Sequence, residues 1–118
     1  MLHCWPFLQE CGFLAKDTIN IFIDTCWQPV LNPAFLKQSF ALWLNYVPLS
    51  KITMGNDATT IEMAAGSSFI AKNILASALS TLSREHSVKR TALRQIAADF
   101  LHNNAVAVYG IGDVFSPS

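Results

Sequence analysis

Short apolar segments alternate with longer amphipathic segments along this chain of 118 residues, and the alternation limits the folds that it can adopt. The run 19–26 is β-branched and aromatic with only Asn20 and Asp24 polar, which predicts a strand covered on both faces. Residues 1–4 and 51–57 predict two further short strands. Alternation of this kind is typical of parallel strands joined by right-handed helical crossovers.

Apolar residues at helical spacing predict the connecting segments. We expect a first helix over 7–17, and a second that begins after Asn32-Pro33, a good N-cap and first-turn pair, and ends at Pro48. A long helix begins near Thr60 and breaks at 83–87, before a last helix whose apolar stripe runs over 93–101. The expected order is therefore strand, helix, strand, helix, strand, helix, helix, in a single domain over 1–118.

Composition excludes several classes of function. Eight basic and eight acidic residues give no net charge, so the basic footprint of nucleic-acid binding is absent. No charge-free stretch reaches the roughly 18–20 residues of a membrane helix, and the N-terminal residues lack the basic region of a secretory signal, so we expect a cytoplasmic protein that does not span a membrane. The three cysteines show no C-x-x-C spacing and are expected to be buried thiols, with neither a disulfide framework nor a zinc knuckle.

Chemistry in a parallel β/α fold is expected at the carboxyl ends of the strands, where the βα loops gather. His3 ends the first strand, Asp24 lies near the end of the second, and Asp57 ends the third, just after Gly55. An imidazole and a carboxylate at one edge suit metal binding or the deprotonation of water. The alternatives are a solvated terminal side chain for His3, a turn or helix N-cap for Asp57, and a polar strand end for Asp24.

The other ionisable residues predict no site. His86 and His102 are expected to be structural or solvated. A cluster of charges near the last helix is expected to form a solvated helix face: Glu85, Lys89, Arg90 and Arg94.

Five local signatures, taken in order, resemble the C-terminal part of the amidohydrolase-related branch of the metal-dependent amidohydrolases. They are LHCWPF (2–7), NIFID (20–24), KITMGNDAT (51–59), NNA (103–105) and YG (109–110). The weight lies in their order and spacing, because each one alone is short. The resemblance implies a partial (β/α)8 TIM barrel of α/β class, made of about the last three β/α units plus a C-terminal helix.

The resemblance also implies a chemistry. It gives His3 a catalytic role in contacting the substrate or the attacking water, and it makes Asp57 both a ligand of a divalent metal, zinc in the complete protein, and a catalytic acceptor of a proton from the bound water. Metal-bound water has a lowered pKa and is the usual nucleophile in such hydrolysis of a C–N or related bond in a small-molecule substrate. Asn56 stands where the family more often has Ser or Thr, a change expected to be mild.

The family's remaining metal ligands, a His-x-His pair and one further residue, would lie before Met1. We therefore expect a truncated portion of a longer enzyme, inactive alone and dependent on its missing N-terminal half or on self-association, because a barrel needs about 250 residues to close. Two alternatives stay open: a non-catalytic remnant that acts as an interaction scaffold, and a sugar isomerase of the uronate type.

Overall fold

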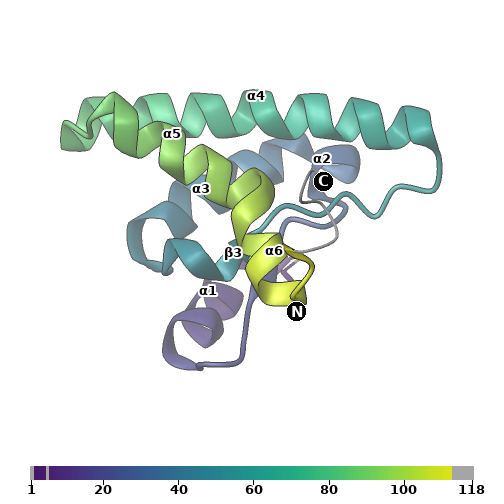
Figure 1. The fold of residues 1–118 in the computed structure, drawn as a ribbon, viewed down its shortest axis with the longest axis horizontal. Helices are drawn as coiled ribbons and strands as arrows, with labels where there is room; N and C mark the ends of the chain where they lie inside the picture. The colour runs from purple at the N-terminus through teal and green to yellow at the C-terminus, as the bar shows by residue number, and fades with distance from the viewer. Residues whose placement is uncertain (1, 5, 113–118) are drawn as a thin grey trace.

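The computed structural model describes residues 2–4 and 6–112, with the side chains of Leu2 and His3 left out. In these residues three short strands, β1 (Leu2–His3), β2 (Ile23–Asp24) and β3 (Ile52–Thr53), form a parallel sheet in the order β1-β2-β3. The chain is otherwise mostly helical (Figure 1). The predicted parallel order is confirmed, while the predicted strand lengths are wrong: within 19–26 only Ile23 and Asp24 have strand partners on both sides.

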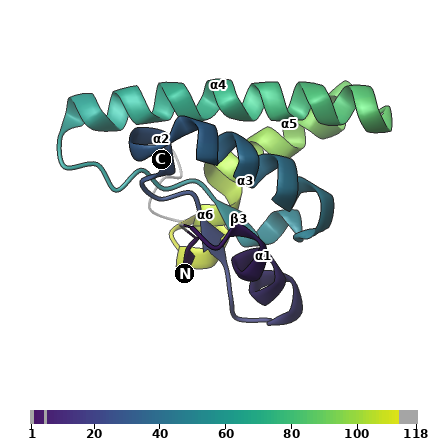
Figure 2. The same cartoon turned by 180° about the vertical axis from the view of Figure 1, so that it is seen from behind.

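Helices connect and cover the strands in chain order. Helix α1 (Leu8–Asp17) follows β1, α3 (Pro33–Tyr46) follows β2, and α4 (Ile61–His86) follows β3. Figure 2 shows α3 between α1 and α4, and α3 contacts both. Consecutive helices that lie side by side outside consecutive parallel strands are the arrangement of repeated β/α units.

Local signals fix the bounds of these helices. Asn32 caps α3, since its side-chain oxygen accepts a hydrogen bond from Phe35 N at 3.1 Å, and Pro33 occupies the first turn. Helix α4 ends at Ser87, which has a left-handed conformation. The loop predicted between β2 and α3 contains one extra turn of helix, α2 (Gln28–Leu31).

The last helical region is longer than the sequence predicts. Helix α5 (Arg90–Ala98) passes through a π-helical turn, η2 (Asp99–Asn103), into α6 (Asn104–Tyr109). In that turn the Asp99 carboxylate accepts hydrogen bonds from the side-chain amides of Gln95 and Asn103, both at 2.8 Å. Figure 1 shows α5 crossing below α4 toward the sheet.

The core lies between the sheet and its helices. Ile23 and Ile52 are fully buried in the sheet, and Phe40 and Trp43 of α3 are fully buried against them. The Trp43 indole donates a hydrogen bond to the Leu8 carbonyl at 3.0 Å, which ties α3 to α1. The buried core is thus formed jointly by the strands and the helices that follow them.

Two polar side chains hold the start of β3. Lys51, in the 3-10 turn η1 (Leu49–Lys51), donates to the Ala15 carbonyl at 2.6 Å, at the end of α1 where a cation is favourable. Asn104 of α6 is buried, and its amide donates at 2.7 Å to the carbonyls of both Leu49 and Ile52. The helices at the end of the chain are thereby fixed to β3, and the sheet formed by the described residues is open, with three strands rather than a closed barrel.

Candidate functional site

The strand register places three residues in one row at the carboxyl end of the sheet. His3 pairs with Asp24, and Asp24 pairs with Thr53. The first two are the residues that the sequence predicts at strand ends, and the backbone places both where βα loops begin. The side chain of His3 lies outside the described part of the chain, so its predicted catalytic role stays a prediction.

The Asp24 carboxylate binds the adjoining loops together. It is buried and accepts hydrogen bonds from Thr53 Oγ1 at 2.6 Å, from Cys26 N at 2.6 Å and from Gly55 N at 3.0 Å. Hydrogen bonds to an ionised acceptor are the stronger ones in proteins, and a buried charge needs them. Asp24 is therefore a structural strand-end residue, the reading that the sequence favoured over catalysis.

Gly55 is required by this carboxylate. A Cβ added at Gly55 would lie 2.4 Å from Asp24 Oδ1, closer than van der Waals contact allows. The sequence predicted a glycine bend after β3, and the structure gives its reason: the backbone must approach the carboxylate closely enough to donate to it.

Asp57 lies in the loop after β3, beyond the groups that bind the Asp24 carboxylate. It is exposed and has a left-handed backbone conformation, with φ of 46°. The alternative that Asp57 caps the following helix is wrong, because Thr60 caps α4 by accepting from Met63 N at 3.1 Å. The preceding Asn56 donates to Ser68 Oγ at 2.9 Å and so ties this loop to α4. A strained conformation for a non-glycine residue in a βα loop is typical of functional positions.

Cys26 lies in this region, and the sequence did not single it out as a site residue. It was predicted to be buried with Cys4 and Cys11; those two are buried, and Cys26 is half-buried. Burial, then the charges of Asp24 and Asp57, raise the pKa of the Cys26 thiol to about 11. The signal available in the sequence was its position two residues after a strand-end aspartate.

A small cavity opens beside Asp57. Its volume is about 140 Å³, and its walls come from the loop after β2, from α2 and from the start of α4. Trp27, which also has a left-handed conformation with φ of 65°, lines it together with Asp57, Leu31 and Met63. The two strained residues of the βα loops thus face one cavity at the carboxyl end of the sheet.

The donors described at this edge do not make up a full set of zinc ligands. No group of three or more His, Cys, Asp or Glu side chains that could hold a metal ion occurs in the described residues. Asp24 already accepts three hydrogen bonds, and the raised pKa of Cys26 keeps its thiol protonated. Because a catalytic zinc ion takes three protein ligands, Asp57 and the other described residues do not by themselves fit one.

The remaining predicted positions lie apart from this edge. His86 and His102 are exposed, as expected. The charged cluster of the last helix region is also exposed, which confirms the predicted solvated face: Glu85, Lys89, Arg90 and Arg94. Within the described ranges, no helix is both long enough and apolar enough to cross a membrane.

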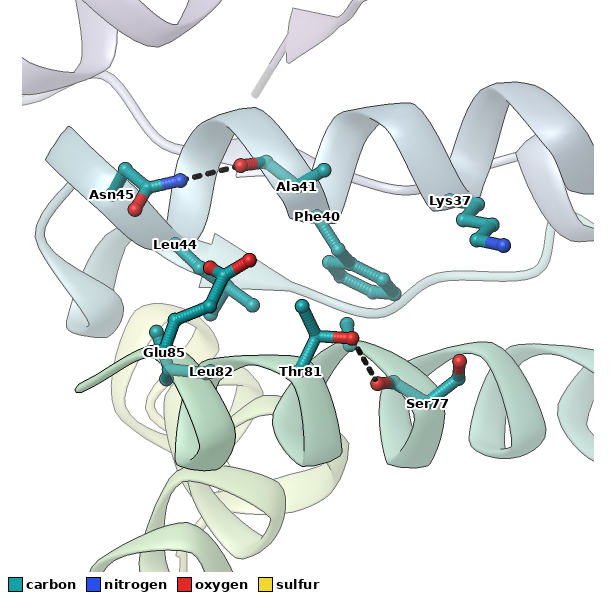
Figure 3. Close-up of a pocket in the computed structure, with 10 residues that line it drawn as sticks. Lys37, Phe40, Ala41, Leu44, Asn45, Ser77, Thr81, Leu82 and Glu85 are labelled. Atoms are coloured by element: carbon teal, nitrogen blue, oxygen red, sulfur yellow. Dashed lines mark hydrogen bonds between the residues drawn. The ribbon is translucent and has the colours of Figure 1, made fainter. Parts of the chain in front are cut away.

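A separate hollow of about 260 Å³ lies between α3 and α4 (Figure 3). Phe40 and Leu82 line it, with Lys37 and Glu85 at opposite ends. Its Thr81 hydroxyl donates to the Ser77 carbonyl within α4, at 3.2 Å. With that hydroxyl engaged within its own helix and no convergent polar groups, this hollow is a weaker candidate than the carboxyl edge.

Comparisons with protein-family models, with curated proteins and with solved structures found no match to this chain.

Proposed function

We propose that this chain is a portion of a metal-dependent hydrolase of the amidohydrolase-related type, made of the last three β/α units of a (β/α)8 barrel. The observation that carries the proposal is Asp57: an exposed carboxylate, held in a strained conformation in the βα loop after the third parallel strand. Active sites of β/α barrels lie at this end of the strands.

The order of the units supports the same proposal. The three parallel strands lie in the sheet in chain order, and a helix follows each strand. Helix α3 packs beside α1, and α4 packs beside α3. Asn104 belongs to the segment NNA (103–105), which resembles the family's closing Asn-Ala motif. Its amide donates hydrogen bonds to the carbonyls at both ends of the 49–52 segment that leads into β3. Buried polar side chains need hydrogen-bond partners, and these two bonds fix α6 to the start of β3.

In this proposal each strand end has its own task. Asp57 supplies one metal ligand and accepts a proton, His3 contacts substrate or water, and Asp24 positions the loop that carries Asp57. The metal, zinc, supplies a water of lowered pKa when bound. The other ligands come from outside the described residues, among which no group of three or more His, Cys, Asp or Glu side chains could hold a metal ion.

Zinc titration of the purified chain tests the proposal. Because the described residues supply only part of a zinc ligand set, we expect weak zinc binding, and Asp57→Asn should weaken it at least tenfold, since even removal of a residue that only orients a ligand costs 10–100-fold. The matched control is Asp17→Asn, which alters an exposed carboxylate at the end of α1 and should leave affinity unchanged. Equal affinities in the wild type and Asp57→Asn would refute the role of Asp57.

A second candidate, a non-catalytic scaffold with the same three units, is favoured by the state of Cys26. The charge of Asp57 helps to raise the pKa of the Cys26 thiol to about 11, and a protonated thiol is not a metal ligand. Large apolar side chains also stand exposed, among them Ile19, Ile61 and Phe69, as a protein that docks to a partner would have. A chain that folds cooperatively and binds no zinc would favour this scaffold over the hydrolase.

A further inference from the structure

We propose that the groove between α4 and α5 binds a single-chain amphiphile with an anionic head, in the form of a free medium- or long-chain carboxylate. The groove has a volume of about 370 Å³, which lies within the range of small-molecule sites in proteins. It uses none of the residues assigned to the carboxyl edge of the sheet, so it is independent of the proposed function.

The floor of the groove is apolar. Leu75 and Leu79 of α4 are buried beneath it, and Leu93 and Ala97 of α5 are half-buried along its other wall. Leu101 continues this wall into η2 and is 42% exposed. Side chains of this kind at i, i+4 spacing form a continuous strip, which suits a flexible hydrocarbon chain lying along the helices.

The rim of the groove is cationic. Arg90 and Arg94 stand one helical turn apart on α5, and Lys72 stands on α4. All three are exposed, and in the part of the chain that the structure describes none has an ion-pair or hydrogen-bond partner. No acidic residue lines this groove. In a chain with no net charge, three unpaired cations around an apolar floor indicate an anionic partner.

The dimensions favour one hydrocarbon chain over a protein helix. From Arg90 to Leu101 the wall spans twelve residues, or about 16 Å of helix. An α-helix is about 10–12 Å across with its side chains, so a segment of that length needs well over the available 370 Å³ to be enclosed. A carboxylate head also suits the arginine pair, because guanidinium groups bind carboxylates through two parallel hydrogen bonds.

Calorimetric titration of the full chain with octanoate, decanoate and dodecanoate, below their micellar concentrations, tests the proposal. We expect affinity to rise about two- to fourfold for each added methylene, the upper figure corresponding to full burial of the group. Arg90→Gln combined with Arg94→Gln should weaken decanoate binding about tenfold, and added salt should weaken it in the wild type. The matched control is Arg84→Gln combined with Lys89→Gln, which removes two exposed cations outside the groove and should change affinity less than twofold.

Other occupants give different results. Binding of anionic phospholipid vesicles without binding of monomeric decanoate would assign the groove to a membrane surface and overturn the proposal. Equal decanoate affinity in both double variants would overturn it as well, as would a Leu79→Asn variant that remains folded by circular dichroism and binds decanoate as tightly as the wild type. Self-association that is abolished by Leu93→Asp, in a chain that binds no decanoate, would assign the groove to a second copy instead.

Discussion

Replacing Asp24 by alanine should destabilise the fold by removing the acceptor that holds the carboxyl edge together. Three donors converge on this buried carboxylate: Thr53 Oγ1, Cys26 N and Gly55 N. A hydrogen bond to a charged group contributes about 1.5–3 kcal/mol, and relief of the carboxylate's own burial offsets part of the loss. We expect a net cost of about 3 kcal/mol, out of a total stability of about 6–18 kcal/mol for a chain of this size.

Urea denaturation followed by the fluorescence of buried Trp43 and by far-ultraviolet circular dichroism measures this cost. The midpoint of thermal unfolding should fall by about 9–15 °C, at about 3–5 °C for each kcal/mol. Asp24→Asn keeps one carbonyl acceptor and should lose less. Asp17→Ala, at an exposed position, should stay within about 0.5 kcal/mol of the wild type. If Asp24→Ala also stays within that range, the three hydrogen bonds to Asp24 do not stabilise the fold.

Three further predictions concern the same edge and the helix that holds β3. Gly55→Ala should cost about 2–4 kcal/mol in urea unfolding, because its methyl group would meet the Asp24 carboxylate at 2.4 Å; a cost under 0.5 kcal/mol would contradict the close approach. Asn104→Ala should cost about 1–3 kcal/mol by leaving two carbonyls without their donor, and hydrogen exchange should show the start of β3 opening more often. Cys26 should be alkylated about fiftyfold more slowly than free cysteine at pH 9, since its pKa is raised to about 11 from 9.0, and Asp57→Asn should speed this reaction. Because the raised pKa favours the protonated thiol in the folded state, Cys26 stabilises the fold below about pH 9. That contribution is lost as the pH rises toward 11.

The helices were the part of the fold that the sequence predicted best. Their apolar stripes repeat over many turns, and Asn32-Pro33 is a local signal that acts through neighbouring backbone groups. The break predicted at 83–87 was placed too early, because α4 continues to His86 and α5 begins at Arg90. The turn α2 and the π-helical turn η2 were missed, because Pro29 indicated only a loop and because the Asp99 hydrogen bonds that stabilise η2 leave no pattern in the sequence. The strands were predicted too long because β-branched composition reports burial, while pairing depends on neighbours distant in the chain.

The candidate site could be predicted as positions but not as contacts. The rule that chemistry gathers at the carboxyl ends of parallel strands selected Asp24 and Asp57. Asp24 ends β2 as predicted, while Asp57 lies in the loop after β3, which already ends at Thr53. Asp24 is buried with three donors, while Asp57 is exposed beside Cys26. This difference depends on how loops 24–28 and 53–57 pack against each other. Local sequence carries no record of that packing, which is why Cys26 was grouped with the two buried thiols.

The central claim is that Asp57 is a metal ligand at the carboxyl edge of three barrel-type β/α units. Anomalous diffraction from crystals of the chain loaded with zinc locates the ion directly. If Asp57 is a ligand, the peak should lie about 2.0–2.2 Å from an Asp57 carboxylate oxygen. A zinc ion that binds elsewhere and leaves the Asp57 carboxylate unliganded would contradict this role of Asp57.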